Sequence, residues 1–276
     1  MHRGRASVAQ QTAAVLVVLL ALGVTAFAQW GWRRTPPKFP PDQIVHRDFT
    51  FSRGLYHSDR REPGGQGWYT DYPNADQNLM IRLSELTTTR VGWDLRHVPD
   101  HVVVPLSDAR ILDYPFLFMS DVGTLSLVSD EVARLREYLL KGGFLWVDDF
   151  WGPNAWDQWA REIGKVLPAA EYPIRDVPMN HPIHKTMFEV TEIPQIPSIQ
   201  HWRRSGGTTS ERGFRTDDVH LRAITDERGR ILVLMSHNTD IADGWEREGE
   251  DYEFFYRFSV DAYELGINIV VHAMSH

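Results

Sequence analysis

Two adjacent aspartates are the first candidates for chemistry in this chain. Asp148 and Asp149 stand near the end of KGGFLWVDDFWG, residues 141–152. The glycine pair and the apolar run predict a helix end followed by a buried strand, which puts both carboxylates at the end of that strand. Two carboxylates so close together repel each other and need a cation, a hydrogen-bond donor or a shared proton. They could hold Mg²⁺ or Ca²⁺. The simpler alternative is that one caps the next helix and the other pairs with an arginine.

Other polar side chains follow a second apolar run or lie between two prolines. His237, Asn238 and Asp240 come directly after ILVLMS, and His181 lies in the proline-flanked NHPIH. Ligands of an open parallel sheet bind at the carboxyl ends of its strands, so we expect these residues to approach the two aspartates. The helical zinc pattern H-E-x-x-H is absent, and a His-Pro loop is more often structural. The metal candidates are Asp148, Asp149, His181 and His237.

A long loop, GLYHSDRREPGGQGWYTDYPN, is rich in glycine and aromatic residues. Structureless loops of that length are commonly functional. Its aromatic residues, together with tryptophans elsewhere, could form a rim for sugars or stacked rings, although half of them could equally belong to the core. The full set of candidate ligand-binding residues is Asp148, Asp149, Trp151, His181, His237, Asn238, Asp240, Trp245, Trp68, Tyr69 and Asp71.

The composition excludes several classes of function. The 276 residues contain no cysteine, so a thiol nucleophile, a thiolate metal site and a disulfide framework are all ruled out. A net charge of −8 argues against nucleic acid or an anionic membrane surface as the main partner. A G-x-S-x-G elbow, a phosphate loop and a G-x-G-x-x-G after a strand are also missing. Catalytic residues therefore stay unassigned.

The N-terminal region has the pattern of an export signal. A basic start, an apolar run over residues 13–24 and the small-x-small Ala26-Phe27-Ala28 predict a signal peptide over residues 1–28. The alternative is an uncleaved N-terminal anchor. Residues 29–48 are proline-rich and predict a linker, and residues 49–276 predict one folded domain. We expect a periplasmic or extracellular protein, held at a membrane only if the N-terminal segment is retained.

Strand and helix patterns alternate through the folded domain. Strands are expected from Phe49 and over residues 102–106, 114–120, 144–149, 221–225 and 230–236. Helices are expected from Ser129, over residues 151–167 and over residues 260–274. Another helix is expected to run to about Thr88, with Asn74 or Asp76 as its N-terminal cap. This alternation predicts an α/β fold with a mainly parallel sheet and helices on both faces.

Several blocks, taken in order, resemble one bacterial family. They are RGLYHSDRREPGGQGWYTDYPNADQNLMIRLSELT, YPFLFMSD, LREYLLKGGFLWVDDFWG, MNHPIH, MSHNTDIADGWER and LGINIVVHAM. Together they are similar to the domain-of-unknown-function family 4159, which is grouped with class I glutamine amidotransferase-like domains. The resemblance implies a three-layer flavodoxin-like sandwich with a mainly parallel sheet.

The resemblance also implies a place for the reactive group. In amidotransferase-like domains, the strand after a Gly-Gly pair leads into the nucleophile elbow, and here Asp148 and Asp149 stand at that point. Because the chain has no cysteine, the amidotransferase thiol mechanism is excluded. Related sugar-associated domains also lack the cysteine, so a carbohydrate ligand remains an analogy.

Two hypotheses for function follow. The preferred one is an exported, non-catalytic domain without a cofactor, which binds a polar ligand or a cell-envelope protein. The alternative is a metal- or carboxylate-dependent hydrolase that uses a divalent cation on a polar substrate, for example a carbohydrate, at the strand ends. A membrane-tethered scaffold is a third interpretation if the N-terminal segment is retained.

Overall fold

The computed structural model describes residues 35–44, 48–62 and 65–275. The chain divides into two units, residues 1–37 and 38–276. The predicted signal peptide, residues 1–28, lies outside the described residues. All strands and helices named below belong to the second unit. Among the described residues, no helix has the length and apolar character that crossing a membrane requires.

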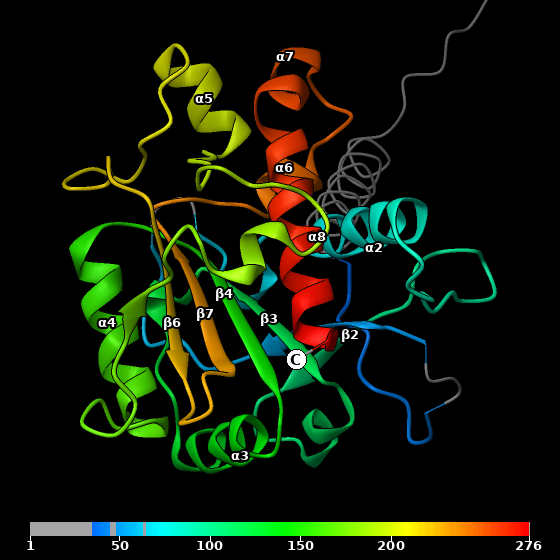
Figure 1. Cartoon of the computed structure of the whole chain (residues 1–276), viewed down its shortest axis with the longest axis vertical. Coiled ribbons are helices and arrows are strands. Elements are labelled where there is room, and N and C mark those ends of the chain that lie inside the picture. Colours follow the sequence, from blue (N-terminus) through cyan, green and yellow to red (C-terminus); the bar gives the residue numbers. More distant parts are fainter. Residues whose placement is uncertain (1–34, 45–47, 63–64, 276) are drawn as a thin grey trace, which may run out of the picture. The chain divides into compact units, whose positions relative to one another are not determined.

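A seven-stranded sheet forms the centre of the second unit (Figure 1). The strand order is β2-β1-β3-β4-β7-β6-β5, in which the first five strands run parallel. Strand β6 is antiparallel to β7, and β5 is antiparallel to β6. The predicted α/β class with a mainly parallel sheet is therefore confirmed. The strands are β1 (Phe51–Leu55), β2 (His101–Pro105), β3 (Phe116–Ser120), β4 (Phe144–Phe150), β5 (Arg175–Asp176), β6 (His220–Thr225) and β7 (Ile231–His237).

Helices pack on both faces of this sheet, in two separate apolar clusters. Helices α2 and α8 cover one face, and α3 and α4 cover the other. The α-helices are α2 (Asn74–Leu86), α3 (Ser129–Leu140), α4 (Gly152–Val166), α5 (Ile199–Ser205), α6 (Asp243–Glu246), α7 (Tyr252–Phe254) and α8 (Val260–Ser275). Short 3₁₀ segments are η1 (Gly67–Tyr69), η2 (Ala109–Asp113), η3 (Val122–Thr124) and η4 (Pro182–Lys185), and η5 (Phe255–Ser259) is a π-helical turn.

The central strands are buried along their whole length because helices cover both of their faces. Every residue of β3, β4 and β7 is buried. The glycine pair before β4 does what its sequence predicts. Gly142 has a left-handed φ of 114°, and a side chain on Gly143 would overlap the ring of Tyr138. The pair thus ends α3 and lets the chain enter the sheet.

Two predicted helix caps are wrong. Helix α2 begins after Pro73, without a side-chain bond from Asn74 or Asp76 to its first turn in the described part of the chain. Helix α4 begins after Trp151, and the side chain that binds its first amide, on Gly152, is that of Asn238, so neither Asp148 nor Asp149 caps it. These carboxylates are engaged elsewhere.

Candidate functional site

A buried arginine fixes the loop that begins the site. Arg53, in the middle of β1, is fully buried, and its guanidinium binds the carboxylate of Asp76 at the start of α2. The same guanidinium donates to the carbonyls of Thr70 at 2.7 Å and Trp68 at 3.2 Å. These bonds hold the segment that carries Asp71. The backbone of Asp71 is left-handed, with φ 64°, a conformation that aspartate tolerates better than most residues.

A bulge at the end of β4 separates the two adjacent aspartates. The register with β7 shifts between Val147 and Phe150, and Asp149 adopts a left-handed φ of 52°. Bulges beside functional sites redirect side chains in this way. The carboxylate of Asp148 accepts from the hydroxyl of Ser236 at 2.6 Å and from the backbone amide of Ala242 at 3.0 Å. It is therefore a structural group between β4 and the segment after β7.

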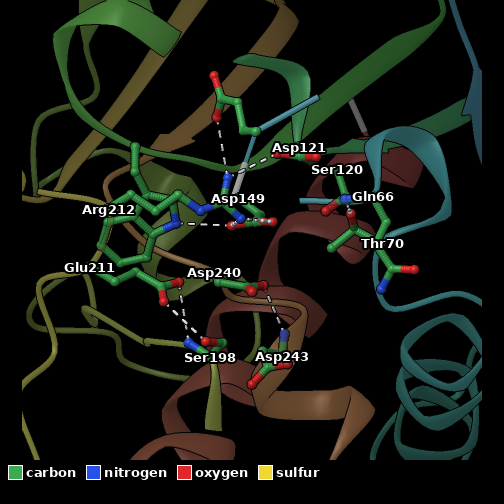
Figure 2. A network of polar contacts seen from close by, with 12 residues as sticks. Gln66, Thr70, Ser120, Asp121, Asp149, Ser198, Glu211, Arg212, Asp240 and Asp243 are labelled. Carbon is green, nitrogen blue, oxygen red and sulfur yellow. Dashed lines mark hydrogen bonds and ion pairs between the residues drawn. The ribbon is translucent and has the colours of Figure 1, made fainter. Parts of the chain in front are cut away.

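Asp149 instead meets an arginine from a distant loop. Both of its carboxylate oxygens accept from Nη2 of Arg212 at 3.1 Å, and Oδ1 also accepts from the indole of Trp151 at 2.9 Å. The other terminal nitrogen of Arg212 donates to Asp121, which follows β3, at 2.9 Å (Figure 2). Asp121 also accepts from the amide of Gly67 at 2.7 Å. The arginine thus joins two strand ends and the long loop.

The chain after β7 supplies two more carboxylates. Asp240 accepts from the backbone amide of Asp243 at 2.9 Å, and Asp243 in turn accepts from the amide of Ile199, at the start of α5, at 2.7 Å. Glu211 accepts from the hydroxyl of Ser198 at 3.0 Å and from its amide at 3.4 Å. The backbone amides of two consecutive residues at the start of α5, Ser198 and Ile199, therefore anchor Glu211 and Asp243.

These side chains line a polar cavity of about 550 Å³ at the carboxyl edge of the sheet. Asp71, Asp240 and Asp243 (the Asp71 triad) place one oxygen each within 4.8 Å of one another, and Asp149, Glu211 and Asp240 (the Glu211 triad) do the same. All five residues are buried. The described residues that line the cavity are Gln66, Thr70, Asp71, Asp149, Ser198, Gln200, His201, Arg204, Glu211, Arg212, Asp240, Asp243, Glu246 and Arg247.

One carboxylate in the cavity is only partly satisfied. Asp71 is 7% exposed, and its Oδ2 has no hydrogen-bond partner among the described residues. A buried carboxylate oxygen without a partner is costly unless a proton, water or cation reaches it. Arg247 also lines the cavity, where its guanidinium binds Glu246 at 2.7 Å and Glu250 at 2.8 Å and lies 3.7 Å from the carboxylate of Asp243.

Burial changes the acid–base behaviour of the cavity. It raises the pKa of Asp243 to about 8, and it raises the pKa of Asp148, which does not line the cavity, to about 7. Burial and neighbouring carboxylates raise the pKa values of Asp71 and Asp240 well above the usual range. Burial also raises the pKa of Asp149, against the opposing charge of Arg212. Burial therefore opposes ionisation of all of these carboxyl groups, and an added positive charge would favour it.

Three of the sequence-derived candidates line the cavity: Asp71, Asp149 and Asp240. Trp151 does not line it, but its indole donates a hydrogen bond to Asp149. The metal candidate His237 does not line it. Its imidazole packs against Phe150 and Trp156, contacts the carbonyl oxygen of Gly152 at 3.2 Å, and has a pKa that burial lowers to about 4.

The other candidates lie in structural positions. His181 caps η4, where its ring accepts from the amide of Ile183. The side-chain oxygen of Asn238 accepts from the amide of Gly152 at 2.7 Å. Trp245 is fully buried against Trp146. Trp68 and Tyr69 stack edge to face in the segment that Arg53 holds.

Sequence reasoning missed Glu211, Arg212 and Asp243. The first two lie in the loop between α5 and β6, and this loop follows no strand of the parallel sheet. Asp243 is three residues beyond Asp240, and the spacing D-x-x-D after the strand ILVLMSH was the one signal that could have found it.

The fold and the site define an α/β domain with an acidic cavity at the carboxyl edge of its sheet. The chain belongs to the family described as domain of unknown function DUF4159, whose pattern matches residues 56–274. None of the curated proteins compared with the chain matches it.

Proposed function

We propose that this chain is an exported, non-catalytic ligand-binding domain of the cell envelope, and that its acidic cavity binds a divalent cation as part of that ligand. The observation that carries the proposal is the Asp71 triad. Three buried carboxylates converge there, and Oδ2 of Asp71 has no hydrogen-bond partner in the described part of the chain. A cation would neutralise their repulsion and give that oxygen a partner.

The ligand atoms favour a hard cation such as calcium. All of the converging groups are carboxylates, which Ca²⁺ and Mg²⁺ prefer over softer ligands. Ca²⁺ binds oxygens at about 2.3–2.6 Å, so it accommodates oxygens up to about 5 Å apart. The three oxygens of the triad lie within 4.8 Å of one another, close enough to share one such cation.

The wider assignment rests on sequence as well as on the cavity. We propose that the domain is a flavodoxin-like three-layer sandwich of the glutamine amidotransferase-like superfamily, and that its N-terminal segment directs export. The parallel strands, and the left-handed Asp149 where such domains place their nucleophile elbow, support the first part. An extracellular or periplasmic location would also supply calcium for the cavity.

Thermal unfolding with and without calcium tests the proposal. At a calcium concentration of 100 times Kd, the free energy of unfolding should rise by about 2.7 kcal/mol. In a domain of this size, that raises Tm by about 5–10 °C. Asp240→Asn should abolish the shift. Asp157→Asn, which removes an exposed carboxylate on α4, should retain it. An equal shift in wild type and Asp240→Asn, or no shift with Ca²⁺, Mg²⁺ or Mn²⁺, would contradict the proposal.

A second candidate function is a cation-dependent hydrolase. The observation in its favour is the position of Asp149 at the bulge of β4, where it lines the cavity beside Asp240. A carboxylate beside a bound cation could take a proton from an attacking water. The test is release of nitrophenol from nitrophenyl phosphate and from nitrophenyl glycosides with calcium present. Hydrolysis by the wild type that is lost in Asp149→Asn would favour this candidate over a binding domain.

A further inference from the structure

A groove of about 1040 Å³ lies at the amino edge of the sheet, opposite to the edge that holds the acidic cavity. The segments directly before β1, β2 and β3 line it. Four large apolar side chains at this groove are well exposed to solvent: Phe39, Ile44, Trp93 and Leu95. We propose that this face of the domain docks on a lipid bilayer, with Leu95 and Trp93 inserted below the headgroups. This inference goes beyond the proposed function and does not depend on cation binding.

Leu95 lies at the tip of a turn that hydrogen bonds hold in place, and its side chain is fully exposed. Trp93 and Pro99 form an antiparallel β-bridge at the base of this turn. The amide of Asp94 donates to the carbonyl of Val98 at 2.9 Å, and the carboxylate of Asp94 accepts from the amide of Val98 at 3.0 Å. Because the turn is pre-formed, a partner that buries the leucine gains apolar contact area at little cost in conformational entropy.

The path of the chain indicates that this partner is a bilayer. Lys38 and Phe39 line the groove, and the carbonyl of Lys38 accepts from the amide of Val103, on β2, at 2.8 Å. Residues 25–37, 13 in number, separate Lys38 from the apolar run over residues 13–24. An extended chain of that length spans at most about 50 Å. An apolar run that stays in a membrane as an anchor therefore tethers the domain by the end that carries the groove.

The charges around the groove favour zwitterionic headgroups. Three cations at this face each have a carboxylate partner, in the pairs Arg90–Asp48, Arg96–Asp94 and Lys38–Asp100. These pairs leave no surplus of positive charge for anionic headgroups, so insertion of apolar side chains has to carry the docking. The tryptophan ring beside the inserted leucine suits the boundary between headgroups and acyl chains. Docking should therefore occur on phosphatidylcholine and should hardly change with salt.

The test places one dye at a time on the full-length protein, reconstituted in phosphatidylcholine vesicles. The chain has no cysteine, so Leu95→Cys and Tyr252→Cys can each carry a single nitrobenzoxadiazole label. Tyr252 is the matched control, because it is exposed and aromatic but lies on α7, which an ion pair between Asp251 and Arg203 joins to α5 beside the acidic cavity. Lipids with a nitroxide on the acyl chain should quench the dye at position 95 at least about threefold more than the dye at position 252, because inserted side chains reach about 5–10 Å into the bilayer.

Equal quenching at the two positions, or none at position 95, would overturn the inference. A dye at position 95 whose emission shifts to shorter wavelength without quenching by the lipids would also overturn it, because a second copy or another protein would then cover this face. Quenching that requires phosphatidylglycerol, or that is lost at high salt, would overturn apolar docking on zwitterionic headgroups. The calcium-dependent Tm of the same protein tests the acidic cavity separately.

Discussion

Two buried groups of charges lie within one end of this domain, and they differ in how they are balanced. In the first, Arg53 meets Asp76, and its remaining donors bind backbone carbonyls. In the second, the carboxylates of the two triads outnumber the arginines that reach them, and one oxygen of Asp71 is without a described partner. A satisfied set of charges stabilises the fold. The unbalanced set is the place where we propose that a cation binds.

The largest expected effect is on the balanced pair. Asp76→Asn leaves the guanidinium of Arg53 buried without its counter-charge, and this should lower the free energy of unfolding by about 3–5 kcal/mol. Urea denaturation measures the loss. The exposed Asp157→Asn should change the same quantity by less than about 0.5 kcal/mol. A loss of similar size in both variants would show that Arg53 and Asp76 do not form a special pair.

The unbalanced set of carboxylates should make the stability of the protein depend on pH. Burial raises the pKa of Asp243 to about 8, from an ordinary value near 4. The protonated form is favoured in the folded state, so its contribution to stability is complete below about pH 4 and is lost as the pH rises toward 8. Without calcium, Tm should therefore fall between pH 5 and 8. The slope for Asp243 alone is at most about 1.4 kcal/mol per pH unit.

Calcium and Asp243→Asn should each flatten that dependence. Calcium replaces the proton as the partner of the carboxylates, and the amide has no charge to bury. A wild-type Tm that rises from pH 5 to 8 in the absence of divalent ions would contradict the raised pKa of Asp243.

The balanced pair and the unbalanced set should also differ in whether loss of one carboxylate lowers or raises the free energy of unfolding. Asp240→Asn removes one of several carboxylates that repel one another, so without calcium it should raise the free energy of unfolding by about 0.5–2 kcal/mol. Residues kept for function at the expense of stability behave in this way. Differential scanning calorimetry in chelator compares the two proteins. Destabilisation by Asp240→Asn, as in Asp76→Asn, would make Asp240 a structural residue.

The smallest expected effect concerns the neighbour of Asp149. Asp148→Asn should cost about 1 kcal/mol, because one hydrogen bond, from Ser236 or from Ala242, is weakened. Calcium binding should not change, since Asp148 does not belong to either triad. Isothermal titration of calcium into Asp148→Asn and Asp149→Asn compares the two aspartates. An equal loss of affinity in both variants would place Asp148 in the cation site.

The sequence predicted the sheet better than the site. Apolar runs such as FLWV and ILVLM mark buried strands directly, and the glycine pair before β4 marks a helix end. Asp149 and Asp240 were candidates because they follow those runs. The same argument included Asp148 and His237, because sequence spacing does not show which way a side chain turns at a bulge or at the end of a strand.

The sequence patterns could not identify site residues that lie in irregular segments, nor the burial of Arg53. Glu211 and Arg212 reach the cavity from a loop whose path depends on tertiary contacts, among them the bond between Glu211 and Ser198. Arg53 looks like any charged residue of an edge strand, and its burial follows from the position of β1 inside the sheet, between β2 and β3. Periodicity carries no information on either feature.

The most direct test of the central claim is a crystal structure of the chain grown with manganese. Anomalous difference density should show an ion between Asp71, Asp240 and Asp243, with carboxylate oxygens as its ligands. Strong manganese peaks elsewhere on the chain with none in this cavity, at a concentration that raises Tm in solution, would contradict the account.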